Sequence, residues 1–273
     1  MSVSLAAVLA SAACVPGARR LPRELPEVSG LVARPGGGYT ALNDGGNAAR
    51  LYALDRDLRL ERALDVEAAN VDWEALSVTD AGYAVCDVGD NRRARVEISV
   101  VLVDSSGRLA ERLPFRYPDG AHDAEACYVR DGHVTVLTKP AVGWFGGDAR
   151  RVAYAYRGSL KRGRSPELQL VDSLALPARS VTDACLLGER LVVLAYEFDR
   201  RLGLPISRTS LFTVGLDAAG RFRDGELLAR RIRAPFTPTQ YEAVGCRPGE
   251  GSVVVASERT LFVPQRWRRV RLP

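Results

Sequence analysis

Asp72-Trp73-Glu74-Ala75-Leu76 is the clearest of five related segments that recur along this 273-residue sequence. The other four are Val28-Ser29-Gly30-Leu31, Asp123-Ala124-Glu125-Ala126-Cys127, Val181-Thr182-Asp183-Ala184-Cys185 and Gln240-Tyr241-Glu242-Ala243-Val244. Four of the five place a carboxylate before a small residue, and the first places a serine there. The aligned positions are Ser29, Glu74, Glu125, Asp183 and Glu242, separated by 45, 51, 58 and 59 residues. A motif that recurs about every 50 residues is typical of proteins built from repeated structural units.

Each segment is followed by three further β-rich runs, which are separated by turn residues. The second runs are Thr40–Asp44, Tyr83–Asp87, Val136–Lys139, Leu194–Glu197 and Val255–Glu258. The third runs are Leu51–Asp55, Ile98–Asp104, Val152–Tyr156, Leu211–Leu216 and Leu261–Val263. The fourth runs are Leu60–Val66, Leu109–Tyr117, Leu168–Leu176, Leu227–Ala234 and Trp267–Leu272. This pattern predicts an all-β fold, a β-propeller of five four-stranded blades, with six blades as the alternative. We expect a single propeller domain over residues 28–273.

The overall composition suits one large folded domain. Hydrophobic residues make up 47% of the chain and charged residues 26%, so a sizeable core is available. The net charge of +5 is mild, and the arginines are spread along the chain without interleaved aromatic residues. We therefore expect no nucleic-acid partner. We expect a monomer whose ligand, a small molecule or a protein, binds at the mouth of the propeller channel.

The first 14 residues resemble a secretory leader, and residues 15–27 are expected to be a lead-in to the propeller. The run from Val3 to Ala13 is uncharged and apolar, and it ends at Cys14, where a bacterial lipoprotein would carry its lipid. Cleavage after Ala12, a misassigned start codon and a frayed terminus are the alternatives. We expect an extracytoplasmic protein, which is periplasmic, secreted or held on a membrane only through a lipid on Cys14.

Four further cysteines lie in predicted strands, at positions 86, 127, 185 and 246. Their spacing matches no zinc module, and the chain has only two histidines. We expect these cysteines to be buried thiols that act as small hydrophobic residues, with disulfides as the alternative.

The repeated carboxylates suggest a function for the channel. The first strand of each propeller blade lines the channel, so the aligned acidic residues are expected to form a ring. The ends of the second strands, namely Asp44, Asp87, Lys139, Glu197 and Glu258, are expected to cluster at the same mouth. Crowded carboxylates repel one another unless a cation neutralises them, and oxygen ligands suit Ca²⁺ better than Mg²⁺. The alternative is a structural role, in which the acidic residues cap backbone amides and fix the packing between blades.

Two polar loops are further candidates for binding. Residues 86–93 combine two acidic residues, Asp87 and Asp90, with an amide and two arginines, and residues 43–47 are a shorter counterpart. Such loops can hold a cation or a phosphate, or can be plain turns between strands. His122 is the best candidate for a general acid or base.

Taken together, these motifs resemble the phytase-like β-propellers, which include domains described as having esterase-like activity of phytase. The resemblance rests on Ser29-Gly30-Leu31, Asn43-Asp44-Gly45-Gly46, Asp72-Trp73-Glu74-Ala75, Asp87-Val88-Gly89-Asp90-Asn91 and His122-Asp123-Ala124-Glu125-Ala126. It implies a ring of channel carboxylates that binds Ca²⁺. The implied ligands are Glu74, Asp87, Asp90, Glu125, Asp183, Glu242 and Glu258. Candidate contacts to phosphate or another ligand are Arg50, Arg92, Arg93 and Lys139. The family has six blades where this sequence predicts five, and Lys139 intrudes among the acidic residues.

These observations favour a binding or scaffold module with a Ca²⁺-binding channel over an enzyme. The first alternative is a metal-dependent phosphoester hydrolase, with His122, Glu125 and Asp87 as its candidate catalytic residues. The second is a five-bladed glycosidase that uses two channel carboxylates. The sequence contains no nucleophile elbow, phosphate-binding loop or dinucleotide fingerprint.

Overall fold

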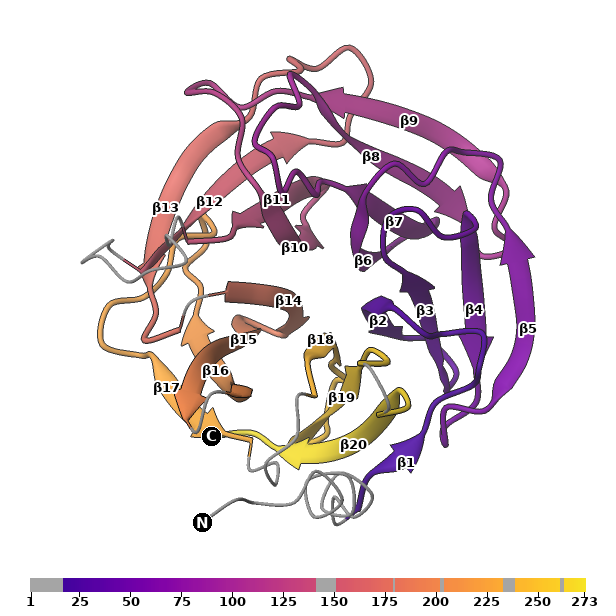
Figure 1. The fold of residues 1–273 in the computed structure, drawn as a ribbon. Coiled ribbons are helices and arrows are strands. Elements are labelled where there is room, and N and C mark those ends of the chain that lie inside the picture. Colours follow the sequence, from indigo (N-terminus) through magenta and orange to yellow (C-terminus); the bar gives the residue numbers. More distant parts are fainter. Residues whose placement is uncertain (1–16, 141–150, 179, 202–203, 233–238, 261–262) are drawn as a thin grey trace.

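The computed structural model is a five-bladed β-propeller, and its innermost strands surround a common axis (Figure 1). It describes residues 17–140, 151–178, 180–201, 204–232, 239–260 and 263–273. Within these ranges there is no helix, and thus none long and apolar enough to cross a membrane. The predicted fold class and blade number are confirmed.

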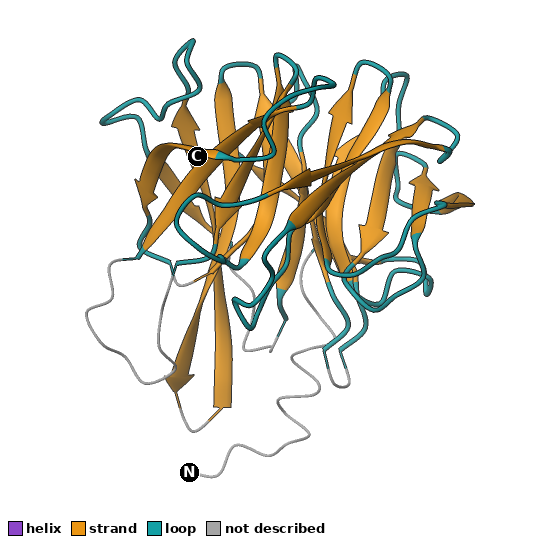
Figure 2. Cartoon of the chain, turned by 90° about the horizontal axis from the view of Figure 1, so that it is seen from above, coloured by secondary structure: helices purple, strands orange, loops and turns teal. Residues whose placement is uncertain are grey.

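Every blade is one antiparallel four-stranded sheet, in which each strand pairs with the next. Blade 1 comprises β2 (Val28–Ala33), β3 (Tyr39–Asn43), β4 (Arg50–Leu54) and β5 (Leu60–Asp65). Blade 2 comprises β6 (Trp73–Thr79), β7 (Gly82–Asp87), β8 (Ile98–Asp104) and β9 (Leu109–Phe115). Blade 3 comprises β10 (Ala124–Arg130), β11 (His133–Thr138), β12 (Val152–Ser159) and β13 (Gln169–Ala175). Blade 4 comprises β14 (Ser180–Leu187), β15 (Arg190–Arg201), β16 (Leu204–Gly215) and β17 (Leu228–Arg231). The strands β15 and β16 are 12 residues long and project beyond the other blades (Figure 2).

The fifth blade closes the ring with strands from both ends of the chain. It comprises β18 (Tyr241–Gly245), β19 (Ser252–Ser257), β20 (Arg266–Arg271) and, outermost, β1 (Arg19–Arg20). The assignment of its outer strands from sequence was wrong: β20 is the third strand, and the fourth comes from the segment expected to be a lead-in. Of the run expected as the third strand, Leu261 and Phe262 lie outside the described residues, and Val263 forms only an isolated bridge with Thr260. Residues 233–234, the predicted end of the last strand in blade 4, also lie outside them.

The hydrophobic core lies between neighbouring blades. Each of five clusters of buried side chains combines residues from two adjacent sheets, including the pair formed by blades 5 and 1. Because the strands alternate their side chains between two faces, each sheet buries both faces against its neighbours. The apolar content seen in the sequence is therefore spread around the ring.

Two disulfides join adjacent blades, which corrects the expectation of free buried thiols. Cys86 pairs with Cys127 between blades 2 and 3, and Cys185 pairs with Cys246 between blades 4 and 5. The sequence places these cysteines in neighbouring repeats but on different strands, and only the packing of adjacent blades shows which of them face each other. Closing loops of this length stabilises a fold by about 4 kcal/mol each through chain entropy.

Gly30 marks how closely the innermost strands approach one another. A Cβ atom at this position would lie 2.8 Å from the backbone nitrogen of Leu76 in the next blade. A side chain here would therefore push blades 1 and 2 apart.

We predict that Gly30→Ala destabilises the propeller by about 1–3 kcal/mol, because the added methyl group clashes with backbone rather than with a movable side chain. Gly251→Ala is the matched control, since a Cβ atom there meets nothing within 4 Å. Denaturant unfolding of both variants measures the difference. Equal stability of the two variants would contradict the close packing of blades 1 and 2.

Candidate functional site

The innermost strand of every blade contains a β-bulge at the same place. In each case one residue is skipped in the pairing with the second strand, and its neighbours on either side pair normally. The skipped residues are Ser29, Glu74, Glu125, Thr182 and Glu242. Bulges re-aim the side chains of a strand, so this repeated irregularity sets where the acidic residues lie.

The register corrects the sequence alignment in blade 4. The equivalent of Glu74 is Thr182, and Asp183 lies one position further along. The carboxylate of Asp183 is fully buried and accepts backbone N–H bonds of 2.8 Å from Ala184 and from Val244 in blade 5. Burial raises its pKa well above the ordinary value, while these N–H groups oppose the shift. These contacts are those of the structural alternative, in which Asp183 fixes one blade against the next.

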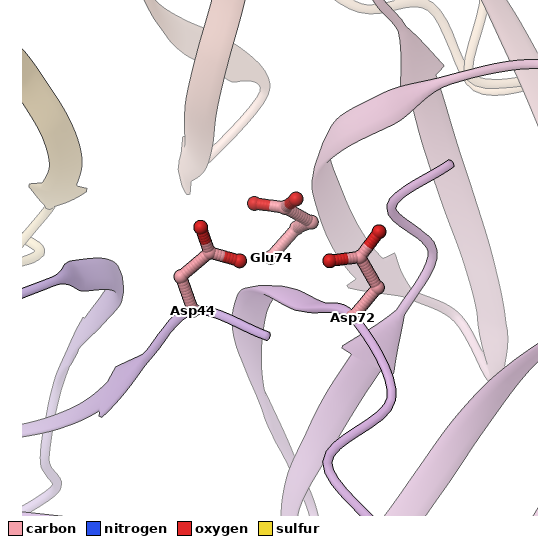
Figure 3. Close-up of side chains that lie close together, drawn as sticks. All are labelled: Asp44, Asp72 and Glu74. Atoms are coloured by element: carbon pink, nitrogen blue, oxygen red, sulfur yellow. The ribbon is translucent and has the colours of Figure 1, made fainter. Parts of the chain in front are cut away.

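Three carboxylates converge at the end of the ring where the innermost strands begin, which we call the mouth (Figure 3). Asp44 follows β3, Asp72 precedes β6, and Glu74 lies on β6 at the bulge. Oxygens of all three lie within 4.8 Å of one another. We call these residues the three-carboxylate cluster. The sequence analysis singled out Glu74 and Asp44 but not Asp72, although Asp72 opens the segment that revealed the repeat.

Two glycines make room for this cluster. A Cβ atom on Gly45 would lie 2.4 Å from Oδ1 of Asp72. A Cβ atom on Gly89 would lie 2.5 Å from Cγ of Asp72 and 2.5 Å from Oε1 of Glu74. The glycines of the two polar loops therefore form a cradle that any side chain would fill.

Burial and mutual repulsion raise the pKa values of these three carboxyl groups. Burial raises the pKa of Asp44 to about 6, and the neighbouring Asp72 adds to the shift. The pKa of Asp72 is raised mainly by burial, against the opposing charge of Arg95. The pKa of Glu74, whose side chain is 4% exposed, is raised by burial and then by Asp44. A carboxylate cluster of this kind favours a bound cation, because the cation removes the repulsion.

Ser29 ties Glu74 to the first blade. Its hydroxyl donates to the backbone oxygen of Glu74 at 2.7 Å and lies 3.1 Å from Oε2. Oε1 of Glu74 lies on the side of Gly89, within the cradle.

Lys139 lies on the blade 3 side of the mouth and neutralises part of its negative charge. Its ammonium group forms an ion pair with Glu125 and lies 3.4 Å from Asp123. Its charge also lowers the pKa of Asp44, Glu74 and Glu242, although burial outweighs it at each. Glu125, a predicted metal ligand, is therefore already neutralised by a side chain of this protein.

Asp87 and Asp90 hold the loop beneath the cluster. Asp87 forms a 2.8 Å ion pair with Arg95 and accepts the backbone N–H of Asp72 at 3.1 Å. Asp90 accepts the backbone N–H of Arg95 at 2.7 Å, and its own N–H donates to Asp123 at 3.0 Å. The sequence analysis missed Arg95, which lies just beyond the quoted loop. Asp87 and Asp90 therefore stabilise the loop next to the cluster through these hydrogen bonds and the ion pair.

Two acidic residues of blade 5 extend the acidic mouth. Burial raises the pKa of Glu242 to about 8, against the hydrogen bond that Gln240 donates to it, and the charge of Glu258 adds to the rise. Burial likewise raises the pKa of Glu258 to about 7. At neutral pH Glu242 is thus mostly protonated and able to donate a hydrogen bond.

The other predicted site residues lie apart from the three-carboxylate cluster. Arg50 pairs with Asp65 on the outer strand of blade 1. Arg92 and Arg93 are exposed, and Glu197 pairs with Arg151. The remaining two are His122, which contacts Asp119 and Tyr156, and Cys14, which lies outside the described residues.

No protein-family model matches this sequence, and no curated protein matches it either. Among solved structures, the chain is similar to an exo-β-1,3-galactanase from Phanerochaete chrysosporium, with a TM-score of 0.58 and 10% identity. The match covers 95% of this chain and 64% of the galactanase chain, so this protein spans less than two thirds of that one. The chain is also similar to a GH43 β-1,3-galactosidase, with a TM-score of 0.48, 9% identity and coverage of 89% of both chains. The WD40 propeller domain of Doa1 gives a TM-score of 0.44 and 12% identity, and the match covers 94% of this chain and 98% of that domain. At these identities the likeness establishes the propeller fold alone.

We predict that Glu242→Gln stabilises the protein at pH 8 by about 1–2 kcal/mol in the presence of EDTA. The folded-state pKa of about 8 exceeds the ordinary value of 4.5, so the folded chain keeps a proton that the unfolded chain has lost. The wild-type protein therefore loses stability as the pH rises between those values, and the glutamine variant does not. Denaturant unfolding from pH 5 to pH 8 measures this difference, with the exposed Glu67→Gln as the control. A constant gap between wild type and Glu242→Gln across that range would contradict the shift.

Proposed function

We propose that this protein is an exported binding module, and that its channel mouth holds Ca²⁺ at Asp44, Asp72 and Glu74. The observation that carries the proposal is the convergence of these three carboxylates within 4.8 Å inside a cradle of two glycines. Carboxylate oxygens are the ligands preferred by Ca²⁺, whose flexible geometry suits side chains from two blades.

A cation at this cluster would leave coordination positions open. Ca²⁺ takes about 6–8 oxygen ligands, more than three carboxylates supply when each binds through one oxygen. Oxygens of a small-molecule or protein ligand at the mouth would complete the shell. The partner we propose is therefore one that offers oxygen atoms to a bound cation.

An oxidising compartment suits the two disulfides, which are rare in reducing cytosol. Together with the leader-like residues 1–14 and the candidate lipid attachment at Cys14, this supports an extracytoplasmic location. The resemblance of the loop motifs to phytase-like propellers agrees with a Ca²⁺-dependent channel. We propose a monomer that touches a membrane only through that lipid.

The second candidate function is hydrolysis of a glycosidic bond, with Glu242 as the general acid and Asp44 as the general base. The two residues lie on neighbouring blades at the same mouth. Their pKa values of about 8 and about 6 leave one mostly protonated and the other mostly ionised at neutral pH. Glycosidases need such a pair, and the fold is shared with a galactanase. The phosphoester alternative is less favoured, because its candidate phosphate contacts lie apart from the three-carboxylate cluster. Arg50 is ion-paired with Asp65, and Arg92 and Arg93 are exposed.

We predict that Ca²⁺ raises the thermal stability of the wild-type protein, by about 2–3 kcal/mol at a concentration a hundredfold above its Kd. Asp44→Asn and Glu74→Gln should each abolish most of this increment, because each removes a charged ligand. Differential scanning calorimetry with Ca²⁺ or EDTA measures it, and Asp65→Asn on the exposed strand β5 is the matched control. The proposal fails if Ca²⁺ leaves the wild type unchanged or stabilises the two cluster variants equally well.

For the second candidate, we predict slow turnover of 4-nitrophenyl galactosides, glucosides or xylosides. Glu242→Gln should lower hydrolysis of the matching disaccharides by about 100-fold or more, the usual effect of losing a general acid, because their alcohol leaving groups need a proton. Release of nitrophenol from the first set of substrates and of monosaccharide from the second, both at pH 7, measures the two proteins. If the wild type releases none from any of these substrates, the glycosidase candidate is discarded and the binding module stands.

A further inference from the structure

A group of aromatic rings lies beside the acidic mouth on blade 3. Tyr117, His122 and Tyr156 pack with ring centroids 4.9–5.1 Å apart. Tyr154 lies further out, 6.4 Å from His122 and 6.5 Å from Tyr156. The inner rings form a base, and Tyr154 extends it towards solvent.

Tyr154 is unusual because it is an exposed aromatic side chain in a chain with few of them. It is 40% exposed, whereas Tyr156 is 1% exposed, and it is the sole aromatic residue among the exposed large hydrophobic residues of the described chain. Its backbone is nevertheless fixed, since its N–H donates to Oγ1 of Thr138 at 3.0 Å. Strand β12 thus holds the backbone of Tyr154 in place and leaves its ring partly open to solvent.

His122 is held in one orientation at the edge of this face. Its Nε2 lies 3.0 Å from Oδ1 of Asp119 and 3.0 Å from the hydroxyl of Tyr156, which itself donates to Oδ2 of Asp119 at 2.7 Å. The carboxylate accepts the tyrosine proton, and in the neutral tautomer that donates from Nε2 to this carboxylate, Nδ1 is an acceptor. Nδ1 has no hydrogen-bond partner within the described ranges.

We call Tyr154, His122 and Asp119 the aromatic shelf. Its polar atoms that are open to a ligand are acceptors, namely Nδ1 of His122 and the carboxylate of Asp119, which is 52% exposed. A matching ligand therefore has hydrogen-bond donors around an apolar face. Pyranose sugars have this form, with C–H bonds on the ring faces and hydroxyl groups at the edges. The acidic surroundings disfavour anionic ligands.

The shelf adjoins the acidic mouth. His122 directly precedes Asp123, whose carboxylate lies 3.4 Å from Nζ of Lys139. Tyr154 is held by Thr138, the residue before Lys139. Because the charge of Lys139 also acts on Asp44 and Glu74, we place the second ring of a two-ring ligand beyond Lys139, on the side of the three-carboxylate cluster.

We propose that the aromatic shelf and the acidic mouth form one carbohydrate-binding site. One sugar ring stacks on Tyr154 with its hydroxyl groups on His122 and Asp119, and the next ring offers hydroxyl oxygens to the cation. This inference rests on the proposed function, because it names the ligand of the cation site. Since His122 and Asp119 are already held by hydrogen bonds before binding, their ordering adds little cost to the contact.

Isothermal titration calorimetry with galactobiose, cellobiose, xylobiose and mannobiose tests the proposal, in Ca²⁺ and in EDTA. We expect at least one disaccharide to bind in Ca²⁺ and to bind less tightly in EDTA. Tyr154→Ala should weaken that binding by about tenfold through loss of the stacked ring, and Tyr154→Phe should retain it. Leu170→Ala is the control, since Leu170 is 52% exposed on the outer strand β13 of the same blade.

Calorimetric scanning of Tyr154→Ala separates this inference from the proposed function, because its stabilisation by Ca²⁺ should equal that of the wild type. Binding of no disaccharide, or equal binding by wild type and Tyr154→Ala, overturns the carbohydrate site even if Ca²⁺ still stabilises the protein. If Ca²⁺ has no effect on the wild type but a disaccharide binds through Tyr154, the cation proposal fails and the shelf stands alone.

Discussion

The close approach of the five innermost strands is the constraint on which the rest of this structure depends. Gly30 lies so near the backbone of the next blade that no side chain fits between them. A bulge at the same place in every innermost strand then directs one polar side chain per blade. The tight ring brings carboxylates from different blades into contact range, and its packing energy opposes their repulsion.

The protein neutralises some of these charges itself. Lys139 pairs with Glu125 and Asp123, and Arg95 pairs with Asp87. Lys139 and Arg95 act on the three-carboxylate cluster through their charge, but among the described residues no salt bridge to Asp44, Asp72 or Glu74 is seen, and two glycines keep space around these carboxylates. The uneven distribution of basic side chains around one acidic mouth is what distinguishes a candidate cation site from acidic residues that support the fold.

Closure of the ring relies on covalent and non-covalent links together. Strand β1 comes from the start of the chain and pairs with β20 near its end, so both termini share blade 5. The disulfides join blade 2 to blade 3 and blade 4 to blade 5. A ring held in this way resists separation of its blades, which keeps the geometry of the mouth fixed from several sides.

The sequence by itself determined the five repeats, the four strands of blades 1 to 4 and the presence of acidic residues at the start of four blades, because strand periodicity and turn residues are local properties. It predicted Glu74 and Asp44 at the mouth, but it placed Asp183 where the register has Thr182, since a one-residue bulge cannot be seen in a spacing. Only the tertiary structure decided which cysteines pair, which acidic residues meet a basic partner, and that Asp72 and Tyr154 belong to the candidate site. Those outcomes depend on distances between blades, and such distances arise only when residues far apart in the chain are brought around one axis.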